Sequence, residues 1–586
     1  MKNSIFIKAL LLLLCICLAF SVTACSKSGE QGDVSSNNSS TESTPSDETP
    51  SDDQIVDENT PQDGYDDTIT DDFTNDDWNT DIDTGVDQPF EMAFDEVVDV
   101  KNGSKPVEDD FLGFNGVYHC YTYMKDSDGR NYTEEQAQTE FNRLQNMGVS
   151  IVRTYYNQEF SYNKETGVFD WESENMQATY KWMKEMQKRN ISVALNAGWS
   201  MRGAYVKDYY APWLGCYVEG DLEASAKNHA NFVSESLKQF RAHGINNIEY
   251  LVLFTEPGGY GDLTQEQKAK IAETPIEDTY DLDPNVHRWL TCSRAIHDVL
   301  VKDGTRNLYQ LVGPNTSGGI KTKNPDTRME PLYYFALKYA SDYVDIYSHH
   351  RYPLISDMAM NTITYVMDND IMMQENIDKA HNLGKKFWYD ETGMTNGSSG
   401  LIGYNKDYFA EGLHEAAYFS DTMNRGVQAL LWWYIFDQQW PNNHTTNTDN
   451  YVNGLHGCGF VPSLLESYIP QYAYYGNSLL TKYFGNNAKV YTAEAILLNA
   501  AAQQDKNGDW SLCAVNMELE NCYIEFNFEK NIGKQKFYRH VYSTDTAIPT
   551  VDAEIIPADK IITTNGDKLV DKIPPNCSVV YTTIKD

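Results

Sequence analysis

The sequence predicts a parallel (β/α)8 barrel followed by a small all-β sandwich, and two observations carry this prediction. Between residues 111 and 484, eight short apolar runs of strand type alternate with eight longer segments of helical periodicity, which is typical of a parallel sheet wound with helices. From about Lys489 the apolar residues alternate with a period of two, which indicates antiparallel strands. An open doubly wound sheet is the alternative, but no Gly-rich phosphate loop follows any strand, and eight strands favour closure.

The barrel strands and helices are expected at defined positions along the chain. The strands are Leu112–Tyr118, Val149–Thr154, Ser192–Asn196, Tyr250–Phe254, Tyr309–Val312, Val344–Ser348, Lys386–Tyr389 and Val427–Trp433. Cap and stop residues bound the first helix at Thr133 and Gly148, and the third at about Leu222 and at His243-Gly244. The other expected helices are Met176–Arg189, Pro284–Asp303, Pro331–Ala340, Met372–Leu383, Phe409–Asn424 and Tyr472–Tyr483.

The period-two region begins with a hairpin. Ala495–Asn499 and Trp510–Val515 flank Asn507-Gly508, a dipeptide that favours tight turns between antiparallel strands. Further on, Ile524, Phe526 and Phe528 alternate with polar residues, and Ser578–Thr582 ends the domain. We therefore expect the barrel at residues 89–484 and the sandwich at residues 485–586.

The N-terminal 25 residues have the layout of a signal peptide. Lys2 and Lys8 precede an apolar run, Ala9–Phe20, that is too short to span a membrane. The following Val22-Thr-Ala-Cys25 resembles the lipobox of bacterial lipoproteins, which implies that Cys25 carries the lipid and becomes the first residue. Residues 26–88 are acidic and rich in Ser, Thr and Asp, so we expect a disordered linker. The body of the protein is then expected on the extracellular face of a bacterial cell membrane, attached through its lipid only.

Composition excludes some classes of partner and site. The 85 acidic residues exceed the 46 basic ones, giving a net charge of −39, so we expect no nucleic-acid partner, because little would neutralise phosphates. No C-x-x-C pair occurs among the cysteines, and we expect neither a zinc site nor a disulfide framework, although one or two bridges stay open. The oligomeric state is not predicted.

Polar residues lie where the expected strands end, which is the face that carries the chemistry in such barrels. They are Arg153, Asn196, Thr255 with Glu256, Asn315, the run His349-His350-Arg351-Tyr352, Asp390 with Glu391, and Trp432 with Trp433. Glu256 and Glu391 end the fourth and seventh strands, and two carboxylates that flank a bond are what glycoside hydrolysis requires. Asp390 is expected to point away from Glu391 if the strand continues regularly.

These positions resemble those of the clan A glycoside hydrolases, including families 5, 30 and 39, and the end of the chain resembles the sandwich of families 30, 39 and 51. The resemblance implies a retaining enzyme that cleaves β-linked oligo- or polysaccharides without a cofactor, with Glu256 as acid/base and Glu391 as nucleophile. Arg153 would orient Glu391, and His350 and Tyr352 would hold the sugar and the nucleophile. Trp432 or Trp433 would form the floor of the subsite where cleavage occurs.

The chain departs from the clan pattern at Thr255, where most members have an Asn whose amide binds the sugar 2-hydroxyl. Either the sugar lies differently, another donor such as Asn196 replaces the amide, or activity is weakened. A non-catalytic glycan-capture lipoprotein and a transglycosylase are the alternatives that stay open. His349 and His350 could suggest a metal site, but no His-x-His pair ends the first strand, so no metal is expected.

Overall fold

The computed structural model describes most of the chain after residue 95. The described residues are 96–102, 108–109, 112–115, 133–155, 158–163, 165–196, 217–257, 263–317, 329–351, 368–393, 408–433, 438–439, 455–456, 469–485, 488–495, 498–550 and 552–585. The expected signal peptide, Cys25 and the linker at 26–88 lie outside these residues and stay predictions. Among the described helices, none combines the length and the apolar character that a membrane crossing requires.

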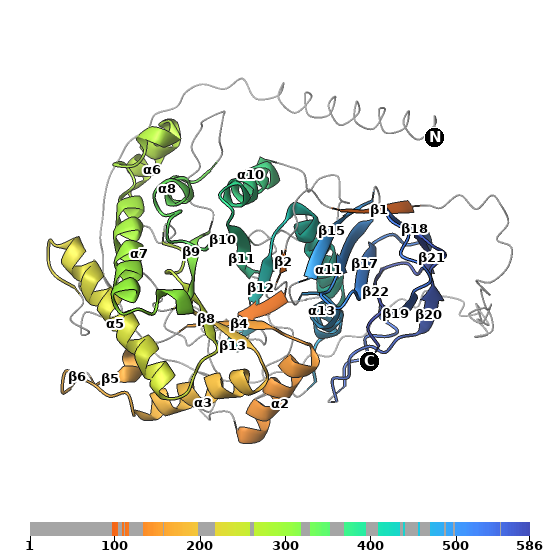
Figure 1. Ribbon diagram of the computed structural model, residues 1–586, viewed down its shortest axis with the longest axis horizontal. Coiled ribbons are helices and arrows are strands. Elements are labelled where there is room, and N and C mark those ends of the chain that lie inside the picture. The colour runs from red at the N-terminus through yellow and green to blue at the C-terminus, as the bar shows by residue number, and fades with distance from the viewer. Residues whose placement is uncertain are drawn as a thin grey trace, which may run out of the picture. The chain divides into compact units, whose positions relative to one another are not determined.

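Eight parallel strands close into a barrel (Figure 1), which confirms the expected fold class. In chain order they are β3 (Leu112–Asn115), β4 (Ile151–Tyr155), β7 (Ser192–Asn196), β8 (Ile248–Val252), β9 (Gln310–Thr316), β10 (Ile346–Arg351), β11 (Lys386–Thr392) and β12 (Ala429–Trp433). Each strand pairs with its neighbour in the chain order, and β12 pairs with β3 to complete the ring.

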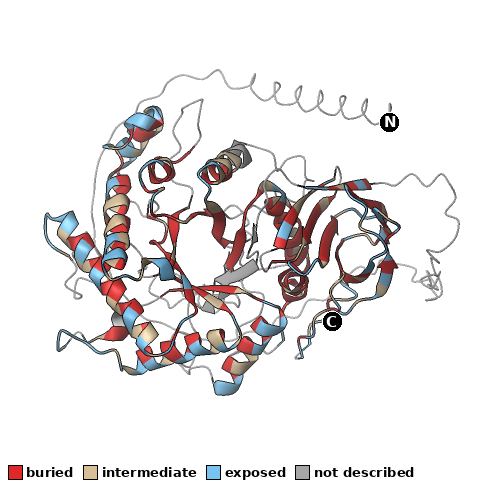
Figure 2. Ribbon diagram, in the orientation of Figure 1, coloured by how far each residue is buried: buried red, intermediate tan, exposed pale blue. Residues whose placement is uncertain are grey.

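Helices follow the strands, close to the predicted bounds. They are α2 (Glu134–Asn146), α3 (Glu174–Lys188), α5 (Leu222–Ala242), α6 (Gln265–Glu273), α7 (Pro284–Lys302), α8 (Pro331–Tyr339), α10 (Asp368–Asn382), α11 (Tyr408–Arg425) and α13 (Tyr472–Tyr483). Thr133 caps α2 through a capping box, since its hydroxyl accepts from the Gln136 backbone while the Gln136 side chain accepts from the Thr133 backbone. Helices such as α5 and α7 bury one face and expose the other, whereas α13 is buried over most of its length (Figure 2).

Alternate residues of the strands enter two different apolar clusters. One cluster fills the barrel interior and includes Ile151, Ala194, Ile346 and Trp388. The residues between them, such as Val152, join a larger cluster that also contains the helix side chains. This alternation fixes which strand residues face the interior, and therefore which polar residues meet at the end of the barrel.

A second apolar core lies in a β-sheet domain. Its strands are β1 (Glu96–Asn102), β2 (Glu108–Asp109), β15 (Ala488–Glu494), β16 (Asn499–Gln504), β17 (Trp510–Asn516), β18 (Cys522–Phe528), β19 (Lys536–Tyr542), β20 (Lys560–Thr563), β21 (Lys568–Ile573) and β22 (Cys577–Thr582). They form one continuous sheet in the order β20-β19-β22-β17-β16-β15-β1-β18-β21, with β2 beside β15. The sheet curls over its core, because Phe526 of β18 packs against Tyr581 of β22, with ring centroids 5.7 Å apart.

The expected boundary between the two domains is wrong at its N-terminal side. β1 lies between β15 and β18 in the β-sheet domain, antiparallel to β15 and parallel to β18, whereas the sequence prediction assigns residues 89–484 to the barrel. The cause is a long-range pairing, because Val98 and Val100 complete the core that the C-terminal strands build. An isolated strand pattern does not tell which sheet it joins.

The barrel and the β-sheet domain are joined through α11. The Asn424 side chain donates to the carbonyls of Ala493 (3.2 Å) and Ala500 (2.9 Å) and accepts from the Ala493 backbone N–H (2.9 Å). Tyr542 of β19 stacks on Phe409 and donates its hydroxyl to the Phe409 carbonyl at 2.8 Å. These contacts make the two domains share one packed interface.

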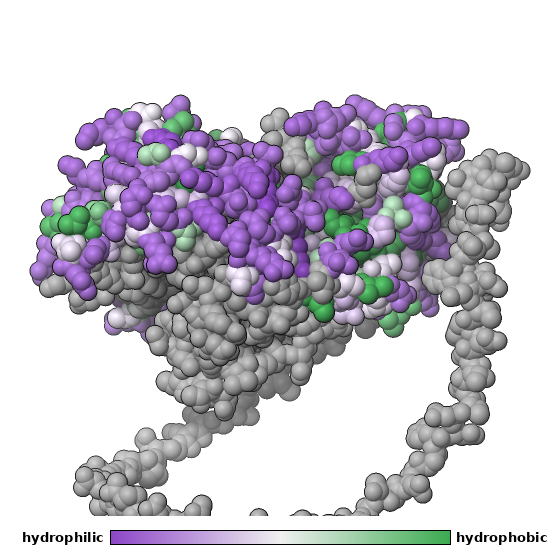
Figure 3. All heavy atoms as spheres, turned by 90° about the horizontal axis from the view of Figure 1, so that it is seen from below, coloured by the Kyte–Doolittle hydropathy of each residue, from purple (hydrophilic) through white to green (hydrophobic). Residues whose placement is uncertain are grey.

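The remaining described elements are short. The short elements are the 3-10 turns Gln158–Ser161, Ile276–Asp278 and Arg306–Leu308, the hairpin of β5 (Tyr162–Asn163) with β6 (Val168–Phe169), and the pair β13 (Gln438–Gln439) and β14 (Leu455–His456). Cys292, Cys513 and Cys577 are buried free thiols. Hydrophilic residues cover most of the described surface on the face shown in Figure 3.

Candidate active site

The barrel period brings the predicted polar residues to one place. Arg153 follows Ile151 by two residues and Asn196 follows Ala194 by two, so both continue the face that lines the barrel interior. His350 follows Ile346 by four and continues the same face of β10. All three side chains are buried, and they meet at the carboxyl ends of the strands.

A bulge in β11 brings the carboxylates of both Asp390 and Glu391 into the site. Ser348 pairs with Trp388, but His350 pairs with Glu391, so β11 holds one extra residue over this stretch. The expectation that Asp390 points away from Glu391 is therefore wrong, because the bulge breaks the alternation of side chains. Both residues approach Arg153, whose Nη1 lies 3.2 Å from Glu391 Oε2 and 4.0 Å from Asp390 Oδ2.

Arg153 donates hydrogen bonds to several other residues of the site. Its Nη1 donates to Glu391 Oε2 and, at 2.7 Å, to the Asp390 carbonyl. Its Nη2 donates to Thr255 Oγ1 at 3.2 Å and to Asn315 Oδ1 at 3.3 Å. A guanidinium fixed by several acceptors keeps its charge, and it fixes the orientation of Glu391 as the sequence predicts.

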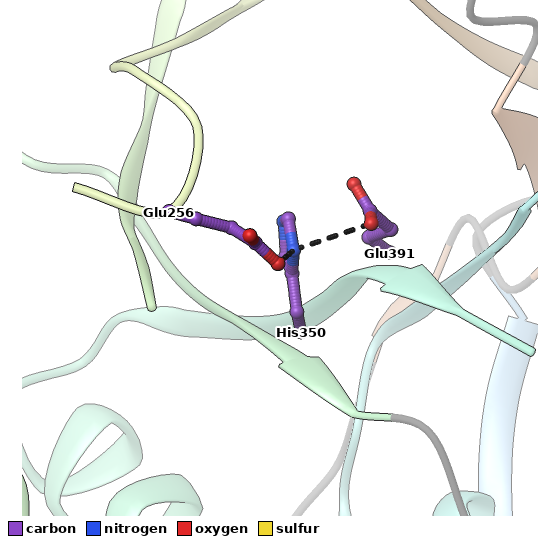
Figure 4. Close-up of side chains that lie close together, drawn as sticks. All are labelled: Glu256, His350 and Glu391. Atoms are coloured by element: carbon purple, nitrogen blue, oxygen red, sulfur yellow. Dashed lines mark hydrogen bonds and ion pairs between the residues drawn. The ribbon is translucent and has the colours of Figure 1, made fainter. Parts of the chain in front are cut away.

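His350 bridges the two candidate catalytic carboxylates. Its Nδ1 lies 2.8 Å from Glu256 Oε1 and 3.4 Å from Glu391 Oε1, and Figure 4 shows the ring between the two side chains. Its Nε2 lies 3.4 Å from Arg153 Nη1 and 3.8 Å from Asp390 Oδ1. One oxygen of each Glu and one ring nitrogen all lie within 4.8 Å of one another.

A layer of neutral groups lies around the guanidinium. Thr255 Oγ1 accepts from the Asn196 amide as well as from Arg153, and it lies 3.4 Å from the Tyr155 hydroxyl. The Asn315 amide donates to Asp390. Thr255 and Asn196 are 3% and 0% exposed, and the Asn196 amide is already used by Thr255. Whether either residue contacts a sugar stays a prediction.

The backbone around Glu256 is unusual. Glu256 has a φ of 44°, Phe254 a φ of 66° and Asn315 a φ of 62°, so three non-glycine residues near the ends of β8 and β9 adopt the left-handed region. The Glu256 N–H donates to the Asn315 carbonyl at 3.1 Å, which ties the two segments together. Each such residue costs about 1–3 kcal/mol, and such strain concentrates at functional sites.

The pKa of Glu256 is lowered and the pKa of His350 is raised in this site. Burial favours a raised pKa for Glu256, but the hydrogen bond and the charge of His350, with a hydrogen bond from Ser317, lower that pKa overall. Burial disfavours the charged form of His350, but the charge of Glu391 and the contact with Glu256 raise its pKa overall. Near neutral pH the proton of this pair therefore resides on His350, and Glu256 is ionised.

The same three side chains, Glu256, His350 and Glu391, offer the oxygen and nitrogen atoms that a divalent cation could bind. Arg153 disfavours such a cation, because its guanidinium lies beside Glu391 and His350 and supplies the positive charge there. The surroundings of Glu256 and Glu391 therefore favour a protonated His350 between them over a bound metal ion.

The structure does not place every predicted site residue in the site. Trp432 is 1% exposed, belongs to the cluster between strands and helices, and packs against Tyr418 of α11 at 6.2 Å. Of the two residues predicted to form the floor of a sugar subsite, Trp432 is therefore the wrong one, because the strand directs its ring away from the barrel interior. Tyr352 and the side chain of Trp433 lie outside the described residues, and their predicted roles are not tested.

Sequence reasoning missed Ser317, which hydrogen-bonds Glu256, and it missed Tyr155. Tyr155 donates its hydroxyl to Glu391 Oε2 at 3.3 Å, and its ring lies 5.1 Å from the Arg153 guanidinium carbon. The signal was available, because Tyr155 follows Arg153 by two residues on the same strand and so faces the same side.

Comparison with known proteins supports the fold. No protein-family model and no curated protein sequence matches this chain. SrfJ from Salmonella typhimurium has a TM-score of 0.53 at 10% identity, with 85% of this chain and 94% of that chain covered. The catalytic domain of GH30 xylanase C from Talaromyces cellulolyticus has a TM-score of 0.52 at 11% identity, with 83% and 99% covered.

A third solved structure, AbfB, a family 51 α-L-arabinofuranosidase from Bifidobacterium longum, has a TM-score of 0.49 at 12% identity, with 84% of this chain and 100% of that chain covered. At such identities, the similarity to SrfJ and xylanase C shows a shared barrel with a β-sheet domain. The function has to be argued from the site itself.

Proposed function

We propose that the chain is a retaining glycoside hydrolase that cleaves β-linked oligo- or polysaccharides. The observation that carries the proposal is the pair Glu256 and Glu391, which have carboxylate oxygens within 4.8 Å of each other at the end of the barrel. Retaining enzymes hold their carboxyl groups about 5–5.5 Å apart, and inverting enzymes about 6.5–9.5 Å apart. Because the nearest oxygens of Glu256 and Glu391 lie within 4.8 Å of each other, the pair fits the shorter range better than the longer one, which supports retention. The fold shared with a xylanase agrees with this proposal.

In the proposed reaction, a Glu391 oxygen attacks the anomeric carbon while the bond to the leaving oxygen breaks, and that oxygen takes a proton from Glu256. In the second step Glu256 removes a proton from water, and the water oxygen displaces Glu391 from the sugar. Arg153 and Tyr155 hold Glu391 through hydrogen bonds to Oε2.

The lowered pKa of Glu256 requires a source for the first proton. His350 supplies it, because its Nδ1 lies 2.8 Å from Glu256 Oε1. His350 first passes its proton to Glu256, and Glu256 then gives that proton to the leaving oxygen as the glycosidic bond breaks. After Glu256 has taken a proton from water in the second step, it returns the proton to His350. The pair shares one proton, and its position sets whether Glu256 acts as acid or as base.

One observation favours the second candidate, glycan capture without cleavage. A lowered pKa leaves Glu256 without a proton in the free protein, and an ionised pair that never exchanges its proton would bind a sugar without cleaving it. The two candidates differ in whether turnover occurs. A transglycosylase would differ from both by forming products longer than a defined starting oligosaccharide.

We also propose that the protein acts outside a bacterial cell, anchored through a lipid on Cys25. Support comes from the sequence around Ala9–Phe20 and Cys25 alone. Metabolic labelling with a radioactive fatty acid tests it. The full chain should take up label and lose it in a Cys25→Ala variant, and equal labelling of both would contradict the proposal.

The catalytic proposal is tested by measuring reducing-sugar release from soluble β-glucan, mannan, xylan and galactan. The full chain should release sugar from at least one of them, and Glu391→Gln and Glu256→Gln should each reduce the rate by 100-fold or more, as order-of-magnitude losses for catalytic groups. Glu266→Gln, at an exposed position of α6, is the matched control. Equal rates in the parent and Glu391→Gln would contradict the assignment of Glu391 as nucleophile. Binding of a glycan without release of sugar would favour the glycan-capture function.

A further inference from the structure

A pocket of about 280 Å³ opens in the β-sheet domain, separate from the site between Glu256 and Glu391. Its lining comes from β1, β15, β16, β17, the turn between β16 and β17, and the segment that follows β18. The four strands belong to the curled sheet, as does β18, which contributes Phe528.

The buried part of the pocket is aromatic. Trp510 and Phe528 are 6% and 3% exposed, and both line the pocket. Tyr491 is half-buried, and its ring centroid lies 4.7 Å from that of Trp510. The Trp510 and Phe528 rings meet edge to face at 5.1 Å. Trp510 and Phe528 support the half-buried Tyr491 from below, so Tyr491 supplies most of the aromatic surface that a ligand could reach.

The rim is polar, and its side chains are fixed by bonds to one another. The Tyr491 hydroxyl donates to Gln504 Oε1 at 3.3 Å, and Gln504 Nε2 donates to the Gly508 carbonyl at 3.0 Å. At the end of β1, the Asn102 side-chain amide donates to Glu529 Oε2 at 3.1 Å. These bonds hold the rim in place before any ligand arrives, which lowers the entropic cost of binding.

The rim carries charges of both signs. The Lys489 ammonium lies 4.5 Å from the centre of the Tyr491 ring and also bonds to Asn102. Glu529 and Lys530 are both exposed members of the lining. A carboxylate among the ammonium groups disfavours a phosphate or another polyanion, while amides and charged groups together both donate and accept hydrogen bonds.

We propose that this pocket binds carbohydrate, a unit of one or two sugar residues. Sugar hydroxyls both donate and accept, as the rim requires, and the C–H face of a pyranose ring suits the aromatic surface of Tyr491. The choice of sugar rests on the proposed function, since a glycan held here would stay near the barrel of the same chain.

The experiment compares variants of the full chain by calorimetric titration. Glu391→Gln is the background in which glycans are not consumed, and the ligands are xylobiose, cellobiose, mannobiose and galactobiose. The pocket variant is Lys530→Ala with Gln535→Ala, two exposed members of the lining. The control is Lys506→Ala with Lys534→Ala, which are also exposed but do not line the pocket.

At least one disaccharide should bind to two sites per chain, and the pocket variant should weaken one of them by 10-fold or more. The control should bind as the background does, and all variants should share one thermal midpoint. If the barrel site fails to bind, one site should remain and be lost in the pocket variant, so failure of the proposed function can be told from failure of the pocket. Unchanged binding in the pocket variant, or no binding outside the barrel, overturns the proposal.

Discussion

His350 Nδ1 lies 2.8 Å from Glu256 Oε1 and 3.4 Å from Glu391 Oε1, so one imidazole contacts both carboxylates of the site. The ring is buried, with its side chain 1% exposed, and Arg153 approaches its other nitrogen. In this geometry the protonation of His350 and that of Glu256 are coupled, and the predictions below begin from that coupling.

Replacing His350 with Asn should change the pH dependence of activity. The raised pKa of His350 keeps the shared proton in the site to a pH above the ordinary value of about 6.5. Without the ring, Glu256 must hold the proton alone. Burial then raises the pKa of Glu256, but from an ordinary carboxyl value about two units below that of histidine. We expect the alkaline fall of kcat/KM to move to lower pH in His350→Asn. A loss of rate at every pH with an unmoved alkaline limb would contradict proton sharing and indicate a structural role.

The same pair should make stability depend on pH. The pKa of Glu256 is lowered in the fold, so its contribution is present above its unfolded pKa of about 4.5 and is lost as pH falls through the folded value. The pKa of His350 is raised, so its contribution is present below about 6.5 and is lost as pH rises through the folded value. The pair should therefore stabilise most between these limits, by an amount on the order of 1 kcal/mol.

Denaturant unfolding of the parent and of His350→Asn across pH 4 to 9 tests this window. The difference in unfolding free energy between them should be largest at about pH 5 to 6 and should shrink on both sides. A difference that is constant across the range would show that the pair does not change its protonation on unfolding.

Removing the Thr255 hydroxyl should destabilise the site. Arg153 and Asn196 both donate to Thr255 Oγ1, and Thr255→Ala would leave two buried donors without this acceptor, at a cost of about 1–3 kcal/mol. Thr255→Ser keeps the oxygen and is the matched control, with a cost below about 1 kcal/mol expected. Thermal unfolding with activity at saturating substrate checks both, and equal midpoints for the two variants would contradict the prediction.

A side chain at Gly412, where α11 packs against Tyr542 of the β-sheet domain, should lower the free energy of unfolding. A Cβ there would lie 2.5 Å from the Tyr542 hydroxyl and 3.0 Å from the Ala473 Cα. At Gly476 the corresponding Cβ would lie 3.3 Å from the Tyr542 ring, a milder contact. Gly412→Ala should therefore cost about 1–3 kcal/mol and Gly476→Ala clearly less, as measured by urea unfolding. An equal loss in both would mean that the Tyr542 ring moves aside.

Strand and helix positions in the barrel follow from local patterns, so they could be predicted. A buried parallel strand is a continuous apolar run, and Arg153, Glu256 and Glu391 could be found because they end such runs. Asp390 could not be placed, because the extra residue in β11 is not encoded by any local pattern. Trp432 and Trp433 are adjacent in the sequence, so a strand pattern alone did not tell which one packs against α11.

Contacts between segments that are distant in the chain could not be predicted from local sequence patterns either. The bridge from His350 to both carboxylates depends on three strands reaching their final positions. The assignment of β1 depends on partners such as Glu494, which lies 393 residues beyond Lys101. Patterns within one segment do not contain this information, since they report burial and periodicity but not the pairing partner.

The insertion of β1 between β15 and β18 has a consequence for how the chain folds during synthesis. The β-sheet domain cannot close when its last strands leave the ribosome unless the early strand has stayed accessible until then. A fragment that begins at residue 485 would expose two bare strand edges where β1 belongs, and we expect it to aggregate. Supplying a peptide of residues 89–110 during its refolding should restore a soluble domain, as size-exclusion chromatography would show; soluble folding without the peptide would contradict this dependence.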